Sequence, residues 1–83
     1  MKIAACDDSR EDRDALRALL EACGHDFEIR EYGSGAELYA DMGYVRECGI
    51  VFHAPLHEAE LHHPLLPQDV VHALRQRLFQ VIL

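Results

Sequence analysis

A short apolar run near the start of the chain ends directly in two acidic residues, and this feature most constrains the fold. Residues 3–6 are small and apolar, as in a buried strand, and Asp7, Asp8 and Ser9 follow at once. In an open parallel sheet, ligands bind at the carboxyl ends of the strands. Two adjacent carboxylates there suit a hard cation such as Mg²⁺. The same residues also make an ordinary helix start, because serine caps helices and the helix dipole favours acids.

A charged helix with one apolar stripe is predicted after the acids. Leu16, Leu19, Leu20 and Cys23 recur at helical spacing on an otherwise polar segment. Apolar and charged residues then alternate over residues 27–30, which predicts a strand with one solvated face near a sheet edge.

A second helix is expected to begin at the S-x-x-E capping box of Ser34, with Leu38, Met42 and Val45 on its buried face. A continuous apolar strand over residues 49–54 follows. The first 54 residues therefore read strand, helix, strand, helix, strand. Helical connections between strands imply a parallel sheet with right-handed crossovers.

The remainder of the chain is predicted to be an irregular segment and a terminal helix. Within residues 55–66, Ala59–His63 fits either a short strand or one helical turn. Pro67 suits the first position of a helix, and the apolar stripe beyond it predicts a terminal helix over residues 67–82. With 83 residues, 49% of them hydrophobic, the chain is expected to form a single α/β domain over 1–83, a small parallel sheet with helices on both faces.

The charge and composition bear on partners and location. A net charge of −7 argues against nucleic acid as a partner, because phosphate binding requires clusters of lysine and arginine. With no long apolar span and no signal-type start, no membrane contact is expected, and a cytoplasmic location is predicted.

Cys6, Cys23 and Cys48 lack any Cys-x-x-Cys spacing and are predicted to be buried thiols. No nucleophile, base and orienting group converge, so no catalytic residue is assigned and the chain is predicted not to be an enzyme.

Two blocks of the sequence resemble the receiver domain of bacterial response regulators, in the branch that carries LytTR-type DNA-binding domains. The first block, Lys2–Leu38, holds the acid pair and an S-G-x-E-L entry to the second helix, and order and spacing match over residues 1–54. The second, residues 63–71, is similar to the receiver's K-P turn into its last helix. The resemblance implies a reduced flavodoxin-like receiver fold without the third and fourth helices and the strand between them. Alternatively, residues 69–77 are the third helix and residues 81–83 begin a fourth strand, but the ungapped Pro-x-x-Pro run favours the first alignment.

The resemblance also implies which site residues are kept and which are lost. The phosphoacceptor aspartate falls at Ala54, so no phosphoacceptor is present, and the lysine before the last proline is replaced by His63. Asp7 and Asp8 alone remain, and they are expected to hold Mg²⁺ only weakly, because Mg²⁺ tolerates incomplete geometry badly. We predict a non-phosphorylatable receiver-like module that acts by protein–protein contact in two-component signalling. It is expected to be a homodimer, because a shortened sheet leaves an edge to be paired.

Four histidines give a second hypothesis. His53, His57, His62 and His63 lie within eleven residues, among acidic residues. Imidazoles and carboxylates suit Zn²⁺ or Ni²⁺, so a metal-binding module is the alternative function. The spacing matches no recognised zinc pattern, and solvated loop histidines are the simpler explanation. A further alternative is a truncated remnant that keeps its fold without a function.

Overall fold

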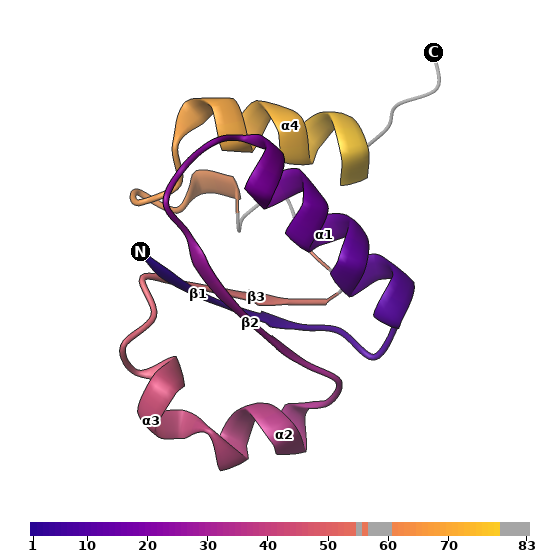
Figure 1. Ribbon diagram of the computed structural model, residues 1–83, viewed down its shortest axis with the longest axis vertical. Coiled ribbons are helices and arrows are strands. Elements are labelled where there is room, and N and C mark those ends of the chain that lie inside the picture. The colour runs from indigo at the N-terminus through magenta and orange to yellow at the C-terminus, as the bar shows by residue number, and fades with distance from the viewer. Residues whose placement is uncertain (55, 57–60, 79–83) are drawn as a thin grey trace.

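A parallel sheet of three strands forms the centre of the computed structural model. The strands are β1 (Lys2–Cys6), β2 (Glu28–Tyr32) and β3 (Ile50–His53), and their order across the sheet is β2-β1-β3 (Figure 1). The strand–helix–strand order and the parallel sheet predicted for the first 54 residues are confirmed.

The structure describes residues 1–54, 56 and 61–78. His57, which belongs to the predicted histidine site, lies outside the described residues. The same holds for residues 79–82, the predicted end of the terminal helix.

The central strand β1 is buried on both faces. Ile3 and Ala4 are 0% exposed, and Ala5 and Cys6 are also buried. Ile3 pairs with Ile29 of β2 on one side and with Ile50 of β3 on the other. A strand with neighbours at both edges and helices on both faces requires a continuous apolar run. This explains why the chain has no polar residue between Lys2 and the first acid.

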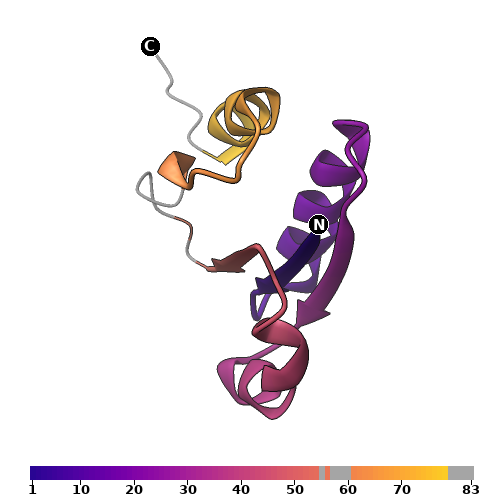
Figure 2. The same cartoon turned by 90° about the vertical axis from the view of Figure 1, so that its left-hand side faces the viewer.

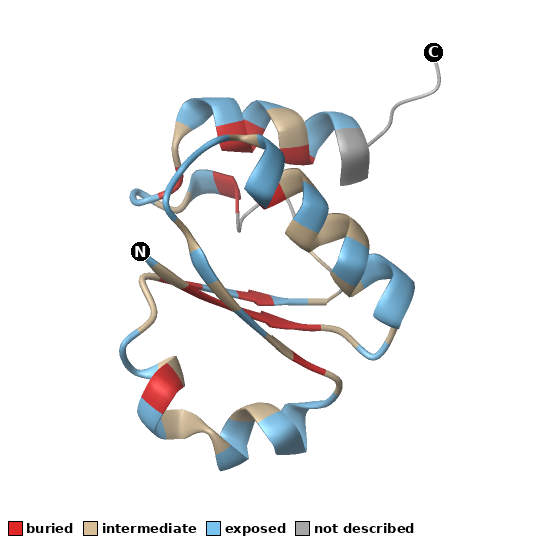
Figure 3. Ribbon diagram, in the orientation of Figure 1, coloured by how far each residue is buried: buried red, intermediate tan, exposed pale blue. Residues whose placement is uncertain are grey.

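Two helices, α1 (Arg10–Ala22) and α4 (Gln68–Leu78), lie on the same face of the sheet (Figure 1). Figure 3 shows the buried side of α4 turned toward α1 and the sheet. The predicted stripe on α1 is confirmed, because Leu20 is fully buried and its three partners pack against the same core. The buried core residues on this face are Ile3, Leu20, Ile50, Phe52, Leu61, Leu66, Val70, Val71 and Leu74.

The other face carries two short helices, α2 (Gly35–Ala40) and α3 (Met42–Val45). The turned view in Figure 2 shows both at the opposite end of the molecule from α4. Helices on both faces of the sheet are thus confirmed. The single helix predicted from Ser34 is wrong, because the helix breaks at Asp41. Leu38 and Val45 pack against the sheet as predicted, whereas Met42 is outside that cluster.

The break in the helix has a visible cause. The Asp41 carboxylate accepts hydrogen bonds from Arg30 at 2.8 Å and from the Tyr32 hydroxyl at 2.7 Å, both on β2. The Asp41 backbone lies outside the helical region, at φ −112° and ψ 35°. Gly43 just beyond it also disfavours a continuous helix. The Asp41 side chain is thus bound to the neighbouring strand β2 at the point where the helix breaks.

The start of α4 is placed within one residue of its prediction. Helix α4 begins at Gln68, and the Pro67 carbonyl accepts the Val71 amide at 3.0 Å, so Pro67 precedes the helix instead of being its first residue. Before it, Leu61 and His62 lie in a short 3₁₀ turn. Of the two alternatives predicted for this segment, the described part is helical.

A pair between a histidine and a carboxylate joins α4 to the loop after α1. His25 Nε2 lies 2.9 Å and 3.0 Å from the two Asp69 carboxylate oxygens, and the His25 ring stacks on Phe27. The hydrogen bond with His25 lowers the pKa of Asp69 below its usual range. A lowered carboxylate pKa stabilises the fold above the pKa of unfolded aspartate, and this contribution is lost as the pH falls through the folded pKa.

We expect the His25→Gln substitution to raise the pKa of Asp69 toward the usual aspartate value of about 3.9. The measurement is an NMR titration of the side-chain carboxyl carbons from pH 2 to pH 6. The pKa of Asp41, which is lowered by its bonds with Arg30 and Tyr32, should not move and serves as the internal control. An Asp69 pKa that is equal in the two proteins would show that the pair does not form in solution.

Candidate functional site

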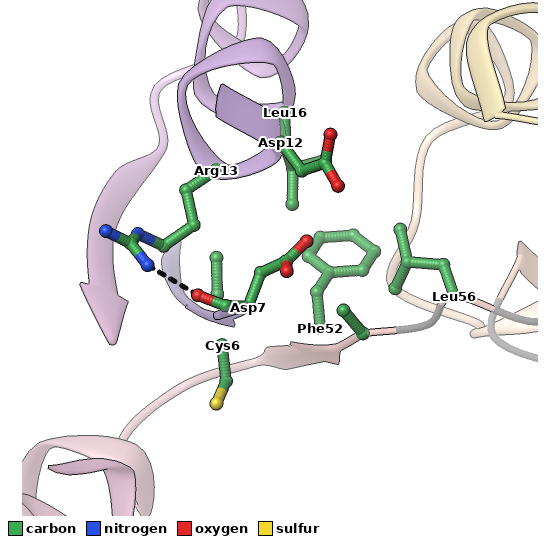
Figure 4. A pocket seen from close by; sticks show the side chains of 9 residues that line it. Cys6, Asp7, Asp12, Arg13, Leu16, Phe52 and Leu56 are labelled. Carbon is green, nitrogen blue, oxygen red and sulfur yellow. Dashed lines mark hydrogen bonds between the residues drawn. The ribbon is translucent and has the colours of Figure 1, made fainter. Parts of the chain in front are cut away.

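A pocket of about 220 Å³ opens where β1 and β3 end. Its lining mixes apolar side chains with two carboxylates and one guanidinium (Figure 4). The lining residues are Ala5, Cys6, Asp7, Asp12, Arg13, Leu16, Phe52, Ala54 and Leu56. The pocket thus lies at the carboxyl edge of the sheet, where the sequence predicts a site.

Asp7 is held at the rim by the turn that starts α1. Its Oδ1 accepts the Ser9 amide at 2.9 Å, and its own amide donates to the Tyr32 carbonyl at 3.0 Å. The Ser9 hydroxyl caps the helix by accepting the Asp12 amide at 3.3 Å. The helix-start interpretation of these residues is therefore correct, and it is compatible with a place for Asp7 in the pocket lining.

The two acids that the sequence pairs are placed differently. Asp8 is exposed and lies outside the pocket lining, whereas Asp12, in the first turn of α1, lines it. Asp12 is not among the site residues that the sequence predicts. Its spacing to Leu16 is the signal that could have placed it, because residues four apart on a helix share a face.

The one basic side chain in the lining, Arg13, forms its contacts with groups other than the Asp7 and Asp12 carboxylates. Arg13 donates to the Asp7 carbonyl oxygen and lies 3.7 Å from the Glu31 carboxylate. Figure 4 shows its guanidinium directed away from the carboxylates of Asp7 and Asp12. Among the side chains of residues 1–54, 56 and 61–76, no basic group forms an ion pair with either carboxylate.

Ala54 lies in the same pocket, directly after β3. Its amide donates to the Cys6 carbonyl at 2.9 Å, which holds the end of β3 against the end of β1. The position that the receiver resemblance gives to a phosphoacceptor is therefore a methyl group in the lining beside Asp7. A methyl group can neither accept a phosphoryl group nor bind a metal.

The cysteine at this edge has the properties of a buried thiol. Burial, with a further contribution from the Asp7 charge, raises the pKa of Cys6. Its side chain belongs to the core with Ala4 and Tyr32. Cys23 and Cys48 are only partly buried, so the predicted burial is confirmed for Cys6 alone. Their partial burial also raises the pKa values of Cys23 and Cys48. A raised thiol pKa disfavours the nucleophilic thiolate.

The predicted histidine site is placed only in part. His53 is exposed on β3, while His62 and His63 line a different pocket with Gln68. His63 Nδ1 accepts the Leu65 amide at 3.1 Å. Within the described part of the chain, no three side chains of histidine, cysteine or acidic residues are close enough to hold a metal ion.

In the part of the chain that the structure describes, no helix is long and apolar enough to cross a lipid bilayer. Comparisons of the chain with models of known protein families, with curated proteins and with solved structures gave no match.

Proposed function

We propose that this chain is a non-phosphorylatable receiver-like module that works by protein–protein contact in two-component signalling in the cytoplasm. The observation that carries the proposal is the pocket in which Asp7 and Ala54 lie together at the ends of β1 and β3. An acid from β1 is kept at the ligand-binding edge, while the neighbouring position on β3 has no group that can be phosphorylated.

The arrangement of the strands supports a reduced flavodoxin-like fold. The order β2-β1-β3 equals the first part of the flavodoxin-like order 2-1-3-4-5.

The packing of α4 bears on the choice between the two alignments of the end of the chain with the receiver domain. A right-handed crossover from β3 to a further strand beyond it would place its helix on the face of α2 and α3. Helix α4 instead packs beside α1, as expected for a terminal helix that follows a deletion.

The predicted homodimer remains part of this proposal. Val51, on edge strand β3, is 41% exposed, which is a large exposure for an apolar residue in a strand. Edge strands are commonly covered or paired in natural proteins. A second copy of the chain is the partner that the sequence predicts for this edge.

The test is intact-mass spectrometry after incubation with acetyl phosphate and Mg²⁺. The wild-type protein is expected to gain no mass, whereas Ala54→Asp is expected to gain one phosphoryl group. In the variant, an oxygen of the carboxylate introduced at position 54 attacks phosphorus, the bond between phosphorus and the acetate oxygen breaks, and acetate leaves with the electron pair. An acyl phosphate at position 54 is the product.

Two double variants make the result specific to this pocket. Asp7→Asn added to Ala54→Asp should abolish the gain, because the cation loses its ligand at the rim. Asp14→Asn added to Ala54→Asp should leave the gain in mass intact. Asp14 is exposed on α1, pairs with Arg10 and lies outside this pocket. Phosphorylation of the wild type would contradict the loss of the switch, and an unmodified Ala54→Asp protein that folds would contradict the receiver-like site.

A further inference from the structure

The pocket beside Asp7 has an apolar floor and a rim with two carboxylates. Phe52 is 1% exposed and forms part of the floor, which Leu16 and Leu56 extend. Figure 4 shows the Asp7 carboxylate next to the Phe52 ring, with the Asp12 carboxylate on the helix above it. The two charges come from different elements, the end of β1 and the first turn of α1.

The size of the pocket limits what it can hold. Its volume of about 220 Å³ is below the roughly 300–1,000 Å³ typical of clefts for cofactors and drug-sized ligands. A single side chain, or a ligand of that size, matches it better than a nucleotide does.

The charge of the lining determines which charge a bound group should carry. The Asp7 and Asp12 carboxylates form no ion pair with the side chains of residues 1–54, 56 and 61–76. Arg13 is engaged by the Asp7 carbonyl and by Glu31. A positive group above the floor would therefore gain two carboxylates without displacing an existing pair. An aliphatic stem that carries a cation covers apolar surface while its charged end stays at the rim.

From this combination we infer that the pocket receives a lysine side chain of a protein partner, with the stem on Phe52, Leu16 and Leu56 and the ammonium between Asp7 and Asp12. The ammonium has three donors around one nitrogen and can reach carboxylates from two directions, whereas the planar guanidinium fork matches one carboxylate. The inference deepens the proposed function, on which it rests, by naming the group that the interaction module recognises.

The experiment follows the amide signals of the full chain by NMR as a blocked lysine, Nα-acetyl-lysine-N-methylamide, is added. Shifts are expected at Asp7, Arg13 and Ala54. The matched norleucine derivative, which lacks the ammonium, should bind about tenfold more weakly, since one charge-assisted hydrogen bond accounts for a factor of this size.

Three variants locate the interaction. Asp7→Asn and Asp12→Asn should each weaken lysine binding about three- to tenfold. The Asp7→Asn side chain keeps an oxygen to accept the Ser9 amide, so the turn should persist. Asp14→Asn removes a carboxylate from α1 outside the pocket and should change the affinity less than about twofold, in line with the small effect of exposed charges.

Several outcomes would overturn the inference. The first is that the norleucine derivative binds as tightly as the blocked lysine. The second is that the correspondingly blocked arginine, titrated in the same way, binds as tightly or more tightly. The others are that butylammonium binds tenfold more tightly than the blocked lysine, or that Mg²⁺ occupies the site in place of lysine. The outcome is separable from the proposed function. If Ala54→Asp is phosphorylated and the wild type ignores lysine, only the inference fails. If the wild type binds lysine and Ala54→Asp stays unmodified, the receiver assignment fails instead.

Discussion

Replacement of Phe52 by alanine is expected to cost about 3–5 kcal/mol of unfolding free energy, the range for deleting a buried aromatic ring. Phe52 lies on β3 with 1% of its surface exposed and belongs to the core that β1, β3, α1 and α4 share. A domain of this length has about 4–12 kcal/mol of stability in total. The substitution should therefore leave a substantial unfolded population, which urea titration followed by circular dichroism would measure.

The adjacent residue provides the control. Val51→Ala, on the same strand but 41% exposed, should cost less than half as much, because little buried surface is lost. Equal losses for Phe52→Ala and Val51→Ala would contradict the burial pattern of β3. Because Phe52 also forms part of the pocket floor, the comparison tests the scaffold of the candidate site.

Replacement of Leu74 by alanine is expected to cost about 2–5 kcal/mol, as for other fully buried leucines. Leu74 is 0% exposed on α4 and packs in the core with Val70 and Leu20. Since Val70, Val71 and Leu74 of α4 are all buried in that core, we expect the loss to appear as a lower thermal midpoint and as faster amide hydrogen exchange in α4.

An exposed residue on the same helix separates packing from helix formation. Gln76→Ala keeps the helical backbone and removes no buried surface, so its free energy of unfolding should stay within about 0.5 kcal/mol of wild type. If Leu74→Ala were as mild as Gln76→Ala, α4 would not be packed on the sheet in solution.

The parts of the fold that were predicted correctly are those that local patterns determine. The stripe from Leu16 to Cys23 lies on the buried side of α1, and Ser9 and Ser34 cap the two helices that they precede. A cap or a helical stripe involves residues three or four apart, so their side chains meet wherever the helix forms. The alternation in β2 is equally local, because successive side chains of a strand point to opposite faces of the sheet.

The parts that could not be predicted depend on contacts between side chains of different elements. The helix breaks at Asp41 because Arg30 and Tyr32, on another element, bind its carboxylate. His25 and Asp69 are 44 residues apart. No periodicity in the sequence encodes either pairing, and the helical spacing of Leu38, Met42 and Val45 alone predicts one continuous helix.

The candidate site shows the same division. Asp7 and Ala54 follow β1 and β3 and line one pocket, as expected from where the two apolar runs end, because the ends of parallel strands meet at one edge of the sheet. Asp8 and Asp12 are both exposed, and that Asp12 lines the pocket whereas Asp8 does not depends on how the chain turns into α1. Adjacent residues in such a turn point in different directions, and which of them lines a pocket follows from the packing of the helix on the sheet.

The central position of β1 has a consequence for the order of assembly. Its two neighbours are separated from it by very different lengths of chain, because Ile3 pairs with Ile29 and also with Ile50. The β1–α1–β2 unit can close early, since its loop is shorter, whereas the pairing with β3 carries the larger entropy of loop closure. One edge of β1 thus stays unpaired until β3 is in place, and until then the unpaired backbone groups of that edge are open to pairing with other chains.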